Sequence, residues 1–231
     1  AEFSVGGATY KLEANNGPNH LHGCFNRKLY RVKSFGDTLL MEAESPDGED
    51  GFPGNLKIAV RYTLTEDNAF RMDYRVSSDA DTIVNLTNHS YFNLDGGGDV
   101  LNQKLRIYAS RYLEGNNQCC PTGAILPVAD TPMDFTAGKL IGREIDTGFA
   151  QTTMVGGGYD HCYVIDRARG SSQSICAWAT SDKTGISMKL YTTQPGIQLY
   201  TANFLQDCPS PGKGGKPLQK YGGFALETQH Y

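Results

Sequence analysis

Apolar and polar residues alternate with a period of two along much of the chain. Residues 56–64 (LKIAVRYTL) and 70–76 (FRMDYRV) follow this pattern on either side of a turn at residues 66–68, and residues 186–191 repeat it. Successive side chains of a strand point to opposite faces of a sheet, so the pattern predicts antiparallel pairing with one buried and one wet face.

Shorter β-like runs fill much of the remaining sequence. They are residues 29–35, 38–43, 82–86, 105–109, 162–165, 175–179, 197–201 and 224–228. Twenty-seven glycines and ten prolines punctuate these runs, as expected for many short strands joined by tight turns. Only residues 136–145 suggest about one helical turn. The pattern predicts an all-β protein, a large antiparallel β-sandwich that forms a single domain over residues 1–231.

Charge and cysteine content exclude several classes of function. The net charge is −4 and the basic residues are scattered, which argues against binding to nucleic acid or to an anionic membrane surface. No apolar run approaches the length of a membrane span. The six cysteines form no CxxC pair and no zinc-like spacing, so we expect reduced thiols, no metal and a cytoplasmic protein.

Two separated segments carry the best candidates for proton transfer. His89 lies among hydrogen-bonding side chains in NLTNHSYFNL (85–94), and an unperturbed histidine titrates near pH 6.5. The alternative is a histidine satisfied by its neighbours in a turn. Glu227 follows an apolar run in GGFALETQH (222–230), where partial burial would raise its pKa toward the range of a general base. A solvated glutamate at a strand end is the alternative.

Further polar residues suit the recognition of hydroxyl groups. Asp160 follows three glycines in GGGYDHCYV (156–164), although an ordinary turn into a strand would look the same. His20 and His22 alternate in a short extended segment, so only one of them faces a given site. Gln198 carries an amide that can read hydroxyl groups, as does Gln194. Four aromatic residues could offer apolar faces to a sugar ring: Tyr91, Phe92, Tyr159 and Tyr200.

This set of side chains suits an uncharged, polyhydroxylated ligand. It lacks the arginine cluster that phosphate or sulfate requires, and no GxSxG motif is present.

Seven segments together resemble the aldose 1-epimerase family, whose members are also called galactose mutarotases. They follow the family order and cover nearly the whole chain. The segments are NGPNHLHG (16–23), SPDGEDGFPGNLKIAVRYTLTEDN (45–68), NLTNHSYFNL (85–94), PTGAILPVADTPMDF (121–135), GYDHCYV (158–164), TTQPGIQLYTANFL (192–205) and GGFALETQHY (222–231).

The resemblance implies a galactose mutarotase-like supersandwich that binds a free aldohexose and interconverts its anomers without a cofactor or metal. It implies His89 as general acid and Glu227 as general base. It also implies His22, Asp160 and Gln198 as substrate-binding residues, and no role for His20. We expect a monomer or a weak dimer.

The family pattern also extends beyond both ends of this chain. An Asn-Arg pair whose arginine contacts the sugar precedes the first matched strand, and further strands follow the last. We therefore expect the chain to be truncated at both ends.

Three other functions remain open from the sequence. A non-catalytic carbohydrate-binding protein could use the same fold, since fold does not determine function. Epimerisation of a hexose 6-phosphate would need a basic pocket. A glycosidase could use Asp160 and Glu227 as its pair of carboxylates.

Overall fold

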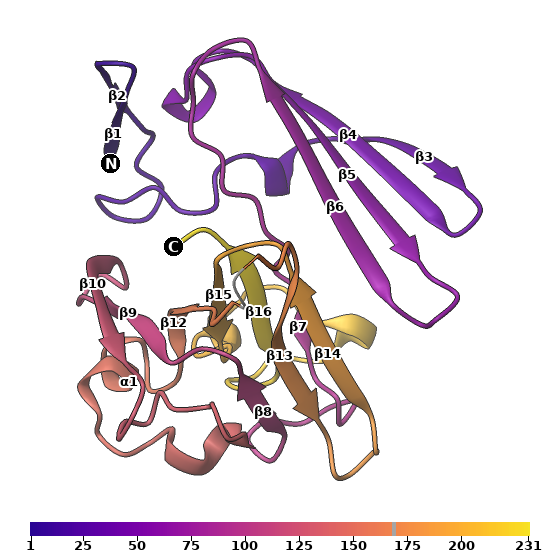
Figure 1. Ribbon diagram of the computed structural model, residues 1–231, viewed down its shortest axis with the longest axis vertical. Helices are drawn as coiled ribbons and strands as arrows, with labels where there is room; N and C mark the ends of the chain where they lie inside the picture. Colours follow the sequence, from indigo (N-terminus) through magenta and orange to yellow (C-terminus); the bar gives the residue numbers. More distant parts are fainter. Residues whose placement is uncertain (168–169) are drawn as a thin grey trace. The chain divides into compact units, whose positions relative to one another are not determined.

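The computed structural model describes residues 1–167 and 170–231, and its regular secondary structure is mostly short antiparallel strands (Figure 1). It folds as two compact units, Ala1–Leu86 and Thr87–Tyr231. A single domain over residues 1–231 stays a prediction.

The first unit holds one two-stranded sheet, β1-β2, and one four-stranded sheet in the order β3-β4-β5-β6. Its elements are β1 (Glu2–Val5), β2 (Ala8–Lys11), β3 (Arg31–Phe35), β4 (Thr38–Ser45), β5 (Leu56–Leu64), β6 (Phe70–Ser78) and the 3-10 helices η1 (Phe25–Arg27) and η2 (Glu49–Gly51). The predicted hairpin is confirmed, because β5 and β6 pair from Leu56 with Ser78 to Leu64 with Phe70.

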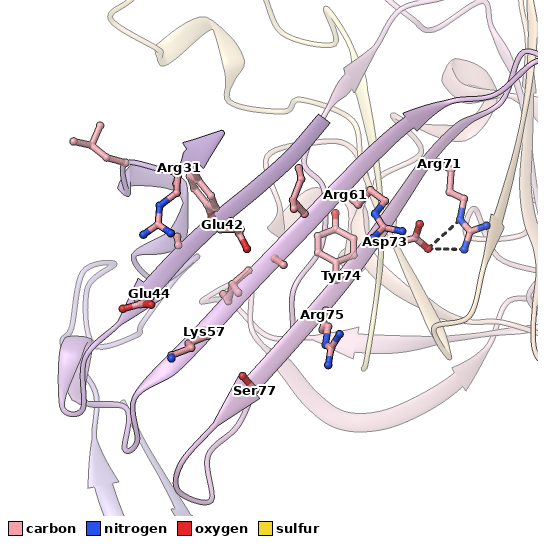
Figure 2. A pocket seen from close by; sticks show the side chains of 16 residues that line it. Arg31, Glu42, Glu44, Lys57, Arg61, Arg71, Asp73, Tyr74, Arg75 and Ser77 are labelled. Atoms are coloured by element: carbon pink, nitrogen blue, oxygen red, sulfur yellow. Dashed lines mark hydrogen bonds and ion pairs between the residues drawn. The ribbon is translucent and has the colours of Figure 1, made fainter. Parts of the chain in front are cut away.

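The four-stranded sheet has an apolar and a charged face. Leu56, Ile58 and Val60 are buried on one face. The residues between them point to the other face, where charged side chains including Arg61 and Arg75 line a hollow of about 1090 Å³ (Figure 2). None of the five predicted site residues lines this hollow.

The predicted strand at residues 82–86 is wrong. This segment, which ends the first unit, pairs with no other strand in the described part of the chain, and Ile83 and Val84 are 48% and 40% exposed. Its β-branched residues favour an extended backbone, but a strand is stabilised by cross-strand neighbours, and here none is available.

The described part of the second unit holds two sheets, with strand orders β10-β9-β12-β15-β16-β7 and β11-β8-β13-β14. Its strands are β7 (Tyr91–Phe92), β8 (Lys104–Ile107), β9 (Arg111–Gly115), β10 (Pro121–Pro127), β11 (Lys139–Leu140), β12 (Asp160–Val164), β13 (Ser174–Thr180), β14 (Ser187–Thr192), β15 (Gly196–Tyr200) and β16 (Phe224–Gln229). Its helices are α1 (Ala150–Met154) and the 3-10 helices η3 (Ile141–Glu144), η4 (Leu205–Asp207) and η5 (Lys213–Gly215). The turn η3 lies within the predicted helical segment 136–145, whereas α1 was not predicted.

The core of the second unit is formed by residues of both sheets. Ile107 and Ala177 come from the four-stranded sheet, and Leu199 and Phe224 from the six-stranded sheet, all fully buried. Fully burying an aliphatic or aromatic side chain stabilises a fold by roughly 1.5–3 kcal/mol. The predicted antiparallel β-sandwich is therefore confirmed, and its six-stranded layer carries one face toward this core and one face away from it.

Within residues 1–167 and 170–231, no helix has the length and apolar character that crossing a membrane requires.

Candidate active site

The face of the six-stranded sheet turned away from the core gathers polar side chains in rows. Glu227 of β16 pairs with Gln198 of β15, and Gln198 pairs with Cys162 of β12. The neighbouring residue Leu226 belongs to the core, so the alternation of a strand directs Glu227 to the opposite face. Three separate strands thereby bring a carboxylate, an amide and a thiol into one row.

A second row lies two residues further along the same strands. Asp160 of β12 pairs with Tyr200 of β15, which pairs with Ala225 of β16, which pairs with Tyr91 of β7. The rings of Tyr91 and Tyr200 approach each other across the small side chain of Ala225, with centroids 6.2 Å apart. This row adds an aromatic wall to the polar face.

His89 enters this face just before β7, the strand next to β16. Its Nε2 lies 3.6 Å from Oε1 of Glu227, too long for a good hydrogen bond but within ion-pair distance once the ring is protonated. The imidazole also contacts Tyr91 and Tyr200, at centroid distances of 5.0 Å and 6.1 Å. The sheet thus places a histidine and a carboxylate within reach of one small ligand.

Asp160 is held by the neighbouring strand. Nε2 of Gln198 donates a hydrogen bond of 2.7 Å to Oδ1 of Asp160. The phenol oxygen of Tyr200 accepts a hydrogen bond of 3.2 Å from the backbone N–H of Phe204, which helps to hold that ring. Asp160 retains further lone pairs for a ligand, because an ionised carboxylate accepts several hydrogen bonds.

Burial changes the proton affinity of both carboxylates. Burial away from solvent is the main cause that raises the pKa of Glu227 to about 7, and the negative charge of Asp160 adds to it. Burial also raises the pKa of Asp160 to about 6, and the hydrogen bond from Gln198 opposes that rise. Near neutral pH, Glu227 therefore exchanges its proton readily, as a general base must.

The glycine run before Asp160 packs against the protein itself. A Cβ on Gly158 would collide with Oδ1 of Asn203 and would lie 2.6 Å from Oγ1 of Thr201. Asn203 Nδ2 donates to the carbonyl oxygen of Val155 at 2.8 Å, and Thr201 Oγ1 accepts from the N–H of Tyr159 at 2.8 Å. This buried network holds the loop that leads into Asp160.

Four of the five predicted site residues lie together on this face: His89, Asp160, Gln198 and Glu227. The fifth, His22, belongs to the first unit and has an exposed side chain and a left-handed backbone (φ +63°). Its role in binding substrate stays a prediction. His20 has a structural place, because its Nδ1 contacts the carbonyl oxygen of Glu13 at 2.7 Å.

The four predicted aromatic residues divide between the two faces of the sheet. Tyr91 and Tyr200 border the polar face, whereas Phe92 packs against the core and Tyr159 is fully buried. The hydroxyl of Tyr159 donates to the carbonyl oxygen of Pro132 at 3.1 Å. Strand alternation separates Tyr91 from Phe92, but sequence alone did not show which of them faces the site.

Two further polar residues lie close to Asp160, and neither was among the five predicted site residues. His161 is nearly fully buried next to Asp160, and Gln151 of α1 contacts it. His161 stands next to Asp160 in the segment GYDHCYV (158–164), which draws attention to it, whereas nothing in the sequence marks Gln151. In the described ranges, no three His, Cys, Asp or Glu side chains gather to hold a metal ion.

The chain matches a protein-family model described as aldose 1-epimerase over residues 1–231. It is 36% identical to the aldose 1-epimerase of Haemophilus influenzae, 38% identical to the galactose mutarotase of Sus scrofa and 36% identical to the aldose 1-epimerase of Escherichia coli. Each of these matches covers 99% of this chain and 66–67% of the relative. The chain thus spans about two thirds of the length of these curated relatives.

Two solved structures show the same fold. The GalM/aldose epimerase homologue from C. elegans has a TM-score of 0.88 at 31% identity, covering 99% of this chain and 68% of that one. Galactose 1-epimerase from Lactobacillus acidophilus has a TM-score of 0.83 at 26% identity, covering 99% and 67%.

Proposed function

Because this chain belongs to the aldose 1-epimerase family, we propose that its protein interconverts the α and β anomers of a free aldohexose such as galactose or glucose. The observation that carries the proposal is the pair formed by His89 and Glu227, 3.6 Å apart on a face that also holds Asp160 and Gln198. No cofactor is needed for this chemistry.

The reaction requires two proton transfers, one at each of the two oxygens bonded to the anomeric carbon. A base removes the proton of the anomeric hydroxyl while an acid protonates the ring oxygen, so the ring opens to the free aldehyde. Rotation about the bond between the first two carbons exposes the other carbonyl face, and reversed transfers close the other anomer. Both oxygens are bonded to the anomeric carbon, so an acid and a base that lie close together can serve them.

The geometry supports distinct roles for the two groups. Glu227 acts as the base toward the anomeric hydroxyl, because burial raises its pKa to about 7 and the proton it takes up is held in the site. His89 acts as the acid toward the ring oxygen, with its Nε2 turned toward Glu227. Each positioned group of this kind contributes typically 10²–10⁴-fold to the rate.

The remaining polar side chains orient the sugar. The carboxylate of Asp160 and the amide of Gln198 form one hydrogen-bonded unit, which suits a pair of neighbouring hydroxyl groups. Tyr91 and Tyr200 offer ring faces beside it. His22 is a further substrate contact in this proposal.

In this proposal the protein works in the cytoplasm, in line with its six free cysteines, and acts as a monomer or weak dimer.

Polarimetry of the natural full-length protein with fresh α-D-galactose or α-D-glucose tests the proposal. The protein should speed the approach to anomeric equilibrium, and His89→Asn should slow turnover by about 10²–10⁴-fold. Wild-type rates in His89→Asn would contradict the role of His89. Hexose binding in calorimetry without faster mutarotation would favour a carbohydrate-binding protein, and hydrolysis of a nitrophenyl glycoside would favour a glycosidase.

A further inference from the structure

The backbone pairing between β9 and β12 ends before it reaches Asp160. These strands pair at Tyr112 with Tyr163 and at Arg111 with Val164. Beyond that point, the backbone of Gly115 bonds to a side chain instead. Its N–H donates to Oε1 of Gln151 at 2.8 Å, and its carbonyl oxygen accepts from Nε2 of Gln151 at 3.2 Å. An amide from α1 thereby replaces a strand partner.

His161 fills the same gap from the side of β12. The backbone N–H of Asp160 donates to Nδ1 of His161 at 3.3 Å, and Nε2 of His161 lies 3.0 Å from Oε1 of Gln151. The ring packs edge-on against Tyr112, with centroids 5.9 Å apart. A Cβ on Gly115 would lie 3.5 Å from Nε2 of His161, so β9 runs directly against the imidazole.

The protonation of His161 follows from its surroundings. It is only 2% exposed, and burial lowers its pKa to about 4, so the ring is neutral at physiological pH. Gln151 offers an oxygen to Nε2, and Asp160 offers an N–H to Nδ1. Both contacts are satisfied by one tautomer, with the proton on Nε2.

We propose that His161 and Gln151 are positioning residues that hold Asp160 in place for sugar binding. His161 accepts from the N–H of Asp160, and Gln151 bonds to the N–H and the carbonyl oxygen of Gly115, where the pairing of β9 with β12 has ended. Gln198 separately donates to the carboxylate of Asp160. The backbone and the side chain of Asp160 are thus fixed independently. This inference rests on the proposed function, since it assigns His161 and Gln151 a task in recognising the sugar.

A purely space-filling histidine would explain the burial but not the contacts. Packing depends on the volume of the side chain, whereas positioning depends on an acceptor at the place of Nδ1. Two substitutions of similar size separate these roles. In His161→Asn the amide oxygen can occupy the place of Nδ1 and accept from Asp160. In His161→Gln the amide reaches toward Gln151 and leaves the N–H of Asp160 without an acceptor.

Steady-state kinetics of the full-length protein with galactose give the first test. His161→Gln should raise KM about tenfold with kcat within about threefold, because the N–H of Asp160 loses its acceptor and its carboxylate is no longer held where the sugar binds. His161→Asn should keep KM within about threefold of wild type. If KM rises equally in both variants, in proportion to the thermal stability that each has lost, the positioning role is overturned.

The tautomer of His161 gives a second test that does not need activity. In ¹⁵N spectra, His161 should carry its proton on Nε2 and should not titrate between pH 8 and about 5. Gln151→Leu should disturb this tautomer. Protonation on Nδ1, or titration near the ordinary histidine pKa of about 6.5, would overturn the inference.

The two proposals can fail separately. A wild-type protein that does not accelerate mutarotation contradicts the proposed function. The positioning role is then decided by calorimetry with galactose, where a weaker affinity in His161→Gln than in His161→Asn supports it, and equal or no binding overturns it.

Discussion

The two faces of the six-stranded sheet are made by alternate residues of the same strands, yet they differ in what burial does. On β16, Leu226 lies in the core and Glu227 lies on the opposite face, and both are almost completely buried at 6% and 8% exposure. Burying the leucine stabilises the fold, whereas burying the carboxylate is unfavourable and raises its pKa to about 7. One face supplies stability, and the other accepts a destabilising group that is useful as a base.

The core face of the sheet also holds the site in place. Glu227 has Leu226 as its neighbour, and Gln198 has Leu199, so each polar side chain extends from a strand whose other face is packed in the core. Side chains on such strands are positioned more precisely than side chains on loops. Substitutions of adjacent residues on β16 should therefore have separable effects.

Glu227→Gln should give the largest effect on activity. The amide keeps the shape of the side chain but cannot accept the proton of the anomeric hydroxyl, so kcat should fall by about 10²–10⁴-fold. Polarimetry measures this loss, and circular dichroism should show an unchanged fold. A variant with more than half of the wild-type kcat would remove Glu227 from the mechanism.

Leu226→Ala tests the other face of the same strand. Truncating a buried leucine leaves a cavity, so the free energy of unfolding should fall by about 2–5 kcal/mol. The kcat of the folded protein should stay within a few-fold of wild type, because Leu226 points away from the site. Urea denaturation and polarimetry on the same sample provide the measurement. A large loss of kcat with unchanged stability would show that the faces are not independent.

The raised carboxylate pKa values predict how stability depends on pH. Glu227 has a folded-state pKa of about 7 against an ordinary value of 4.5, so between these pH values the folded state keeps a proton that the unfolded state releases. Stability should therefore fall as pH rises from about 4.5 to 7, by on the order of 3 kcal/mol. Asp160, whose pKa is raised from 3.8 to about 6, acts in the same direction at lower pH.

Glu227→Gln is the control for this dependence, because it removes one of the two titrating groups. Unfolding measured by urea between pH 4.5 and 8 should show a shallower decline in the variant than in wild type. If stability depends on pH identically in both proteins, the pKa of Glu227 is not raised in the folded state. The same pKa predicts that kcat/KM of the wild type declines as pH drops below about 7, where Glu227 becomes protonated.

Much of the architecture could be predicted from local alternation, because a period of two is a property of each strand by itself. Alternation does not show whether a segment will pair. Residues 82–86 have a β-like sequence but pair with no other strand in the described part of the chain. Pairing between distant strands is not encoded locally, so the contact of Gln198 with Asp160 could be expected only from the family resemblance. Gln151 could not be expected at all, because its function depends on a gap in the ladder beside Gly115.

Gln198→Leu should give the smallest effect on activity. It separates sugar binding from proton transfer within the polar face. Leucine has a similar volume but lacks the N–H that donates to Asp160 at 2.7 Å. Loss of this bond should raise the pKa of Asp160 further above its ordinary value, because the donation from Gln198 lowers it. KM should rise about tenfold, consistent with roughly 1.5 kcal/mol for a hydrogen bond to a charged group, while kcat changes little.

Gln194→Leu is a matched control outside the two rows of the polar face and should leave KM unchanged. If kcat falls instead and KM is unaffected, Gln198 acts in proton transfer rather than in orienting the sugar.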